Sequence, residues 1–447
     1  MPARPARYAC RPNESTVKER KASALTEGIR IHDLCDPEYS EAGAAAIQAI
    51  DETPFEFSLE AIVTAARAEC DVPFFADQIE DDGTLERLDE YLRAVRADRH
   101  QSRIGRFQTT QYAKRHLIQR SRLEALYAEH PEIEEIEIER PLIIAGLPRS
   151  GTTHLLNLIG ADRRLRSLRY WESLEPFPSP AARRGEIEDV RRQNGRAQLD
   201  IQDMMMPLFR NMYDVENDGI HEEVELQHMC MSTLMMAASA QVDDWMRSYF
   251  RRDQRPHYAF MKRAIKALQF LEPRQRWVLK SPQHLSFVPD LLDCFPDATL
   301  VVTHRDPVAV FTSWATMLTY AARFSRSPVD VHETAAYAQL LMKLLLDGLV
   351  RDKSAIPEDR SEHVYFHEFM ADDWGTLARI YERAGLSFTD ETRTSMRKYI
   401  EEHPRGRHGK ILYDLKEDFE IEREDVYAVF ENYLAAFPKV QREEPNQ

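Results

Sequence analysis

Three features are missing from this chain of 447 residues: cysteine motifs, long apolar runs and an excess of basic charge. Its five cysteines are scattered without a Cys-x-x-Cys pair, which argues against a disulfide framework and against a zinc site. No run approaches the ~20 apolar residues that a membrane-spanning helix needs. The basic segment at residues 1–30 lacks the apolar stretch of a secretory signal peptide. These absences predict a protein of the reducing cytoplasm, without a membrane span.

The formal net charge of −16 bears on the kind of partner that the protein binds. General nucleic-acid binders carry a basic surface, so this acidic balance argues against nucleic acid as a partner. Local arginine and lysine residues can still bind one small anion. The length exceeds that of one typical domain and is sufficient to bury a large core.

The apolar pattern divides the chain into three predicted parts. Residues 1–33 carry little apolar periodicity, which predicts an extended, mobile arm. Residues 34–139 are predicted to form a helical N-terminal extension, and residues 140–447 the main domain. Apolar residues recur in the extension at steps of three and four, as at Leu85, Leu88, Leu92 and Val95. We interpret the extension as a scaffold and as a candidate homo-oligomer interface.

The main domain alternates short apolar runs with helical patterns. The runs typical of buried strands lie at residues 142–145, 168–171, 276–280, 298–303 and 363–366. Because helical patterns follow these strands, they predict a parallel sheet. The expected fold class is therefore α/β: a P-loop-type parallel sheet flanked by helices, with the helical N-terminal extension before it.

The most informative motif follows the first of these strands. The run 142–145 breaks at Gly146, turns through Pro148-Arg149-Ser150-Gly151 and restarts as a helix at Thr152. Such a loop directs backbone N–H groups and a helix N-terminus at an anion, which makes a phosphate cradle. The Gly-x-x-x-x-Gly spacing of a P-loop is present, but the Lys-Ser/Thr pair that should follow is not. Without that pair, Mg-ATP chemistry is hard to build, and Arg149 supplies the positive charge instead.

Two further strands end in cationic residues. Lys280 closes the run 276–280, and Arg305 follows the run 298–303. Ser313 lies eight residues after Arg305, about two turns into the next predicted helix. Ligands of open parallel sheets bind beyond the carboxyl ends of the strands. Arg305 and Ser313 are therefore expected to bind one anion there, the arginine by charge and the serine by its hydroxyl.

Three segments together resemble the sulfotransferases that use 3′-phosphoadenosine 5′-phosphosulfate (PAPS). They are Gly146-Leu-Pro-Arg-Ser-Gly-Thr-Thr153, Lys280-Ser-Pro-Gln-His-Leu285 and Arg305-Asp-Pro-Val-Ala-Val-Phe-Thr-Ser313. The likeness runs from about Pro141 to Phe437, and the N-terminal part resembles the extension of a bacterial branch. It implies transfer of a sulfuryl group from PAPS to a small-molecule hydroxyl or amine, with the product PAP and no metal.

The resemblance also implies roles for individual residues. It places five loop residues around the 5′-phosphosulfate: Arg149, Ser150, Gly151, Thr152 and Thr153. Arg305 and Ser313 match the clamp for the 3′-phosphate, which selects this nucleotide over ATP. Arg407 and Gly409 match the last nucleotide-binding loop. His154 stands where some relatives carry a tryptophan that stacks on adenine.

The residue that deprotonates the acceptor is left open among several candidates. Sulfuryl transfer to a hydroxyl needs a base, and Lys280 fits as the cation that stabilises the leaving phosphate. Cytosolic relatives place a histidine where this chain has Pro282, and the nearest one here is His284. Other branches use a glutamate from a helix, a place occupied here by residues 219–226. The preferred candidates are Glu222 and Glu223, about 100° apart on that helix, before His284 and then His221.

The acceptor side is marked by methionine. Nine of the fifteen methionines lie between Met204 and Met246, and methionine adapts to varied apolar ligands. Such a stretch is typical of a plain hydrophobic core. The alternative interpretation is that these methionines line the site of a lipophilic acceptor.

Two rival functions remain at this point. One is a P-loop phosphotransferase using ATP, against which the missing lysine after Gly151 counts. The other is a catalytically inactive nucleotide-binding scaffold, against which Lys280 and the candidate bases count.

Overall fold

The computed structural model describes residues 28–274 and 276–444. Most of the predicted arm, residues 1–27, therefore lies outside the described residues. Residues 28–33 run alongside a C-terminal segment: the Ile29 N–H donates to the Lys410 carbonyl at 2.7 Å, and the Leu412 N–H donates to the Ile29 carbonyl at 2.8 Å. Ile31 is buried against Ile411, so this end of the arm is packed.

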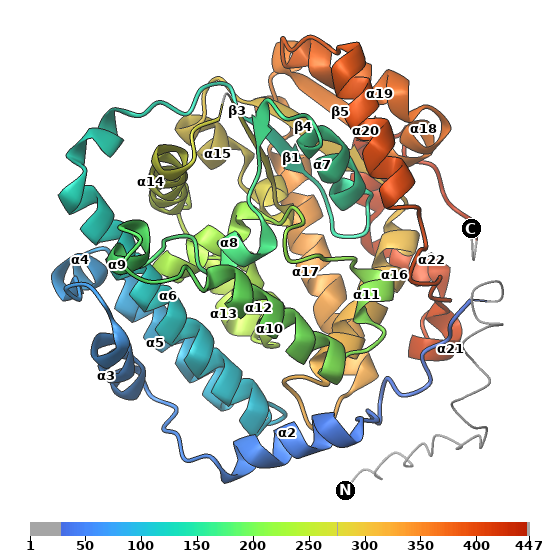
Figure 1. Ribbon diagram of the computed structural model, residues 1–447. Coiled ribbons are helices and arrows are strands. Elements are labelled where there is room, and N and C mark those ends of the chain that lie inside the picture. Colours follow the sequence, from blue (N-terminus) through green and yellow to red (C-terminus); the bar gives the residue numbers. More distant parts are fainter. Residues whose placement is uncertain (1–27, 275, 445–447) are drawn as a thin grey trace, which may run out of the picture.

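A five-stranded parallel sheet forms the centre of the molecule, in the order β2-β3-β1-β4-β5 (Figure 1). Its strands are β1 (Leu142–Ala145), β2 (Leu165–Arg166), β3 (Arg276–Lys280), β4 (Thr299–His304) and β5 (Ser361–Tyr365). On the central strand, Ile144 pairs with Lys280 of β3 and with Val301 of β4. The α/β class predicted from the sequence is confirmed.

The strand predicted at residues 168–171 is wrong. The second strand lies at Leu165–Arg166, and Tyr170 already begins the helix α8 (Tyr170–Leu174). The Glu172 carboxylate accepts the Arg169 N–H at 3.3 Å, which stabilises the first turn of that helix. This local capping outweighs the apolar character of the run.

Each face of the sheet is covered by helices. Successive residues of a strand point to opposite faces, so Ile143 joins one apolar cluster and Ile144 the other. The Ile144 side packs on helices α7 (Thr152–Gly160) and α19 (Asp373–Arg383). The Ile143 side packs on helices α14 (Arg255–Leu271), α16 (Pro307–Ala322) and α17 (Val331–Arg351). Burial on both faces explains the apolar run of β1 and the apolar centres of β3 and β4.

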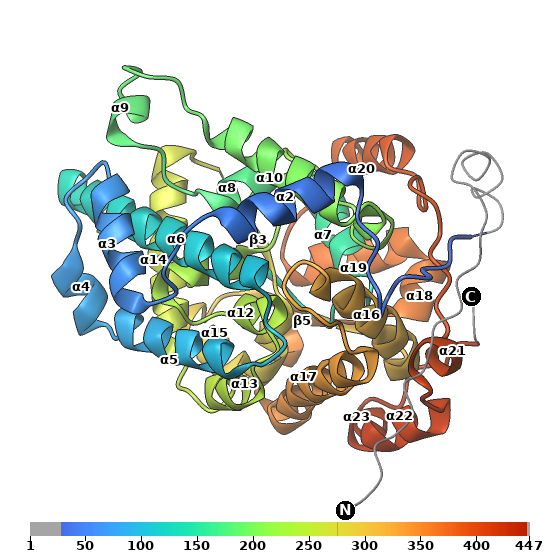
Figure 2. The same cartoon turned by 90° about the horizontal axis from the view of Figure 1, so that it is seen from below.

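The N-terminal extension is helical, as expected. It comprises α2 (Glu41–Glu52), α3 (Leu59–Glu69), α4 (Ala76–Asp81), α5 (Thr84–Ala97) and α6 (Arg103–Glu129). Its apolar face, with Leu88 and Leu92, belongs to the same buried cluster as Ile143 of the sheet. Helix α2 lies across α6 and α10 (Figures 1 and 2). The extension therefore shares the main core.

Short helices connect the remaining chain. They are η1 (Pro131–Glu135), α9 (Pro180–Arg183), α10 (Arg191–Met205), α11 (Phe209–Met212), η2 (Glu223–Cys230), α12 (Leu234–Ser239), α13 (Asp243–Tyr249), η3 (Pro282–Ser286), α15 (Val288–Cys294), η4 (Lys353–Ala355), η5 (Glu358–Arg360), α18 (Phe366–Ala371), α20 (Asp390–Glu402), α21 (Leu415–Phe419), α22 (Arg423–Val429) and α23 (Glu431–Ala436). Within the described ranges, no helix has both the length and the apolar character needed to cross a bilayer.

Candidate functional site

The carboxyl ends of four strands meet at one edge of the sheet, and the loop after β1 lies between them. At Gly146 an added Cβ would come 1.9 Å from Thr303 Oγ1 of β4, so only glycine lets the loop leave the sheet this closely. Gly151 has φ 89°, in the left-handed region, and immediately precedes helix α7. Both glycines are therefore required by the shape of the loop.

The loop presents an uncapped helix N-terminus. No side chain among the described residues caps α7, so its first N–H groups remain open to an anion. The Ser150 hydroxyl donates to the Leu147 carbonyl at 2.6 Å and lies 2.7 Å from Thr303 Oγ1. Ser150 therefore holds the loop in shape, while Thr152 and Thr153 line an adjoining cavity.

Arg149 and Ser313, predicted to bind different phosphates, are in direct contact. Arg149 Nε donates to Ser313 Oγ at 2.9 Å, and its Nη2 donates to the Tyr413 hydroxyl at 3.4 Å. Arg149 also donates to the Met212 carbonyl. Arg305 Nη1 donates to the Arg149 carbonyl at 2.7 Å. The two arginines and the serine thus form one connected group.

Arg305 already holds a carboxylate. Its Nε and Nη2 each donate to an oxygen of Glu443 at 2.7 Å, and its guanidinium lies 3.9 Å from the centre of the Phe366 ring. The Glu443 N–H in turn donates to Asp306 Oδ2 at 2.7 Å. A paired, ring-backed guanidinium of this kind is suited to a planar or tetrahedral anion. Glu443 occupies the position where the sequence predicts a phosphate.

The loop at residues 404–410 adjoins this group without lining the cavity. Arg407 donates to Asp214 at 2.7 and 2.9 Å and to Glu216 at 2.6 Å, and these hydrogen bonds raise its pKa. The Gly409 carbonyl lies 3.5 Å from Asn211 Nδ2, and Gly409 has φ 97°. The loop is thereby fixed to residues 211–216, which also contact Arg149.

His154 is packed within α7 and against α18. Its ring lies 5.8 Å from the Phe369 ring. Burial, with Arg405 as a smaller cause, lowers the pKa of His154 to about 4. The imidazole is therefore neutral at neutral pH.

Lys280 and Glu222 lie together at the end of β3. Lys280 is 2% exposed, and its Nζ donates to Glu222 Oε1 and lies 3.5 Å from Thr153 Oγ1. Lys280, Glu222 and Thr153 all line the same cavity. This places a cation and a carboxylate between the loop and the cavity.

Glu223 and His284 lie on the opposite side of the lysine's backbone. Glu223 Oε2 accepts the Lys280 N–H at 2.6 Å, and its Oε1 lies 2.6 Å from His284 Nε2. His284 Nδ1 is 2.9 Å from the Tyr258 hydroxyl. Both residues are fully buried and absent from the cavity lining. They fix the end of β3.

The segment expected to be an α-helix at residues 219–226 is instead the 3₁₀-helix η2, with Glu222 as its N-cap. In this helix adjacent side chains lie ~120° apart and side chains three residues apart eclipse. Glu222 and Glu223 therefore point in different directions, whereas Glu222, Glu225 and His228 share one side.

His221 also lines the cavity. Its Nδ1 lies 3.2 Å from the Ser173 hydroxyl. Burial lowers the pKa of His221, with Glu225 and Glu222 opposing the shift. A neutral imidazole next to Glu222 is a second group able to accept a proton.

The cavity has a volume of 350 Å³ and is mostly apolar. Its walls come from α5, α6, α10, η2, α12 and α16. The methionine-rich stretch is divided: Met206, Met231, Met235 and Met236 line the cavity. Others belong to the core, including Met205, Met212, Met229 and Met246. Part of the stretch therefore lines the cavity and part belongs to the core, and the lipophilic acceptor stays a prediction.

Several residues of this region escaped the sequence reasoning. Glu443, Phe366 and Tyr413 come from distant segments and belong to no motif. His116, Glu225 and His228 form a buried group whose donor atoms lie within 4.8 Å of one another. The Glu-x-x-His spacing of the last two was the one available signal.

Comparison with known proteins assigns this geometry to a family. The model of the sulfotransferase family matches residues 141–390. Sulfotransferase STF9 from Mycobacterium avium is 28% identical with a TM-score of 0.73, covering 88% of this chain and 100% of its own. Sulfotransferase STF1 from Mycobacterium tuberculosis H37Rv is 23% identical with a TM-score of 0.71, covering 85% and 98%. No curated protein matches the chain.

Proposed function

The chain belongs to the sulfotransferase family, and we propose that it transfers the sulfuryl group of PAPS to a hydroxyl, or an amine, of a small lipophilic molecule. One observation carries this proposal. Lys280 and Glu222 contact each other in the wall of an apolar cavity, beside the threonines of the loop. The cavity is the acceptor site, and the loop is the nucleotide site.

The anion-binding residues fit a nucleotide with two separate phosphate groups. The open N-terminus of α7 would hold the 5′-phosphosulfate, together with Arg149, Thr152 and Thr153. Arg305 and Ser313 would hold the 3′-phosphate, and the carboxylate of Glu443 on Arg305 supports this, because it is a bidentate anion in that place. The loop with Arg407 and Gly409 would close over the nucleotide. PAPS, when bound, supplies the activated sulfuryl group, and no residue of the mechanism requires a metal.

Glu222 is the base of this proposal. Its carboxylate faces the cavity, so it is placed to take the proton of an acceptor hydroxyl. Lys280 neutralises Glu222 in the resting protein and stabilises negative charge on the leaving phosphate during transfer. Glu223 positions Lys280 through the backbone N–H, and His284 positions Glu223.

The two rival functions predict different ligands. An ATP-dependent phosphotransferase needs the lysine that this chain lacks after Gly151. An inactive scaffold has no need of a paired Lys280 and Glu222 in a cavity wall. We place the protein in the cytoplasm. A homo-oligomer formed through α2–α6 remains a prediction, which light scattering would test by measuring the molecular mass.

The nucleotide assignment is tested by thermal stabilisation. PAP should raise the Tm without Mg²⁺, and ATP should raise it much less. The double variant Arg305→Ala with Ser313→Ala should remove this preference while keeping the fold. Equal stabilisation by ATP and PAP, or a strict need for Mg²⁺, would overturn the assignment. Transfer of label from ³⁵S-PAPS to a panel of lipophilic alcohols then tests the reaction itself.

A further inference from the structure

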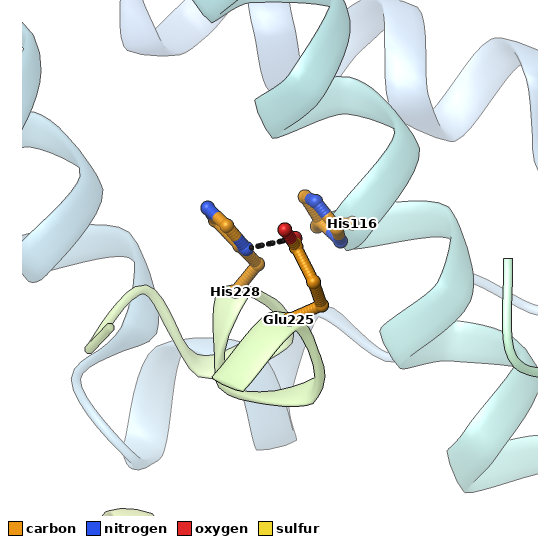
Figure 3. Close-up of side chains that lie close together, drawn as sticks. All are labelled: His116, Glu225 and His228. Atoms are coloured by element: carbon orange, nitrogen blue, oxygen red, sulfur yellow. Dashed lines mark ion pairs between the residues drawn. The ribbon is translucent and has the colours of Figure 1, made fainter. Parts of the chain in front are cut away.

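A polar cluster of His116, Glu225 and His228 lies at the wall of the acceptor cavity. His116 belongs to α6, and the other two residues belong to η2. His116 and His228 line the cavity, and Tyr112, one turn before His116, lines it with them. Figure 3 shows the Glu225 carboxylate and the two imidazole rings pointing toward one another. The nucleotide site and the proposed base use none of these side chains.

The cluster has hydrogen-bonding capacity that the protein leaves unused. His116 is 1% exposed, and neither of its ring nitrogens has a hydrogen-bond partner among the described residues. His228 Nδ1 lies 2.9 Å from Glu225 Oε2 and contacts it, so the unused capacity lies on His116. Burying unpartnered polar atoms costs about 1–3 kcal/mol per group. Such atoms in a cavity wall point to a ligand.

The ring geometry argues against a metal ion as that ligand. The His116 and His228 rings are stacked, with centroids 4.6 Å apart and planes only 7° from parallel. A metal ion binds in the plane of an imidazole, along the nitrogen lone pair, and two stacked rings cannot both direct a lone pair at one ion between them. Arg115, which precedes His116 in the sequence, adds a positive charge that also disfavours a bound cation.

The protonation states favour a neutral group that both donates and accepts. Burial, together with His228 and Arg115, holds the pKa of His116 well below its usual range, so His116 offers one N–H donor and one bare nitrogen. Burial acts to raise the pKa of Glu225, but His228 outweighs it and the carboxyl stays ionised. Arg115 also acts to lower the pKa of Glu225. A hydroxyl can accept from the N–H of His116 or donate to its bare nitrogen, whereas a carbonyl only accepts and an ammonium only donates.

We propose that His116, with Glu225 and His228, binds a second hydroxyl of the acceptor, further along η2 from Glu222. This inference rests on the proposed function, since it takes the cavity to be the acceptor site. Glu222 caps η2, and the helix residues from Glu223 to His228 span ~10 Å along its axis. The acceptor is therefore an elongated lipophilic diol, with the reacting hydroxyl at Glu222 and the other at His116.

The test compares diols with alcohols that differ only by the second hydroxyl. Binding of the α,ω-diols of butane, octane and dodecane, and of the matching mono-alcohols, is measured by calorimetry on the PAP complex. Octanediol should bind ~10-fold more tightly than octanol, and butanediol should show no such gain, because it cannot reach both ends. His116→Phe keeps a ring in the stack and should remove the gain.

Two further variants make the test decisive. Glu225→Gln preserves shape and should also reduce the gain, and it replaces His116→Phe if that variant fails to fold. Thr109→Val is the matched control on the same helix: its hydroxyl lines the cavity but already donates to the Gly105 carbonyl at 3.0 Å, so the gain should persist.

Each outcome bears on a stated proposal. Equal affinity for octanediol and octanol, including no binding of either, would overturn the second-hydroxyl site. It would also be overturned if octanediol kept its gain in affinity over octanol in both His116→Phe and Glu225→Gln. If the purified protein contained stoichiometric zinc that His116→Phe lost, the cluster would be a metal site and not a hydroxyl site. Failure of PAP to bind, or of ³⁵S-PAPS to transfer label to any alcohol, would instead refute the proposed function.

Discussion

The nucleotide edge of the sheet and the acceptor cavity are built in opposite ways. At the edge, Arg149, Lys280 and Arg305 each follow a strand, and nearly every polar group is paired. The cavity is assembled from helices distant in sequence, and His116 in its wall has no partner among the described residues. Charge and strand position therefore specify the first region, whereas shape and a few polar atoms specify the second. Substitutions in the two regions should therefore affect nucleotide binding and acceptor binding separately.

Lys280 and Glu222 stand at the boundary, so they should have the largest effect. Lys280→Ala and Glu222→Gln should each lower kcat by roughly 10²-fold or more, because charge stabilisation or proton removal is lost. PAP affinity should persist in Glu222→Gln, as measured by calorimetry. Glu223→Gln is the matched control: it keeps an acceptor for the Lys280 N–H and should cost stability, about 1–3 kcal/mol, more than turnover.

Full turnover in Glu222→Gln would remove Glu222 as the base. If His284→Ala were then inactive with PAP binding intact, the base would be His284. If all of these variants stayed active, no dedicated base would be needed, and His221→Ala is the remaining single variant to measure.

Arg149 belongs to the nucleotide edge, and it also borders the cavity. Arg149→Ala should weaken PAP binding by roughly 10- to 100-fold, because a charge-assisted contact to phosphate and its bond to Ser313 are lost. Arg149→Lys should lose less, since the charge remains. Unchanged PAP affinity in Arg149→Ala would contradict the cradle assignment.

A substitution in the cavity should weaken acceptor binding and leave nucleotide binding unchanged. Met235→Phe adds volume to the lining and should raise the KM for a lipophilic acceptor by roughly 10-fold, through lost fit. The Kd for PAP should stay the same. Ile187→Phe, at an exposed position, is the control for the chemical change itself. A parallel rise in PAP Kd would mean that the two regions are not separable.

The smallest effect concerns pH. The pKa of His154 is lowered to about 4 in the folded protein, against ~6.5 when unfolded. Between these values the unfolded chain binds the proton and the folded protein does not, so stability falls as the pH is lowered from 6.5 to 4. His154→Gln should reduce this loss of Tm by roughly 1–3 °C, and the exposed His32→Gln should not.

The same contrast explains what the sequence could predict. The strands that precede Arg149 and Arg305, and the strand that ends at Lys280, were placed correctly, because burial on both faces gives each of them a central apolar run. The distinct roles of Glu222 and Glu223 were not accessible, since they depend on η2 being a 3₁₀-helix. Glu443 on Arg305 and His116 beside His228 join segments more than a hundred residues apart, and no local pattern encodes such contacts.

The 3₁₀-helix η2 has one more consequence. Glu222 and His228 belong to a single short run of backbone, so the hydrogen-bonded 3₁₀-helix sets the spacing between them. The side walls come from separate helices, α6, α12 and α16, which are held together only by packing. Breathing of those helices changes the width of the cavity but not its length. The protein should therefore tolerate branching along the middle of an acceptor while discriminating sharply between chain lengths.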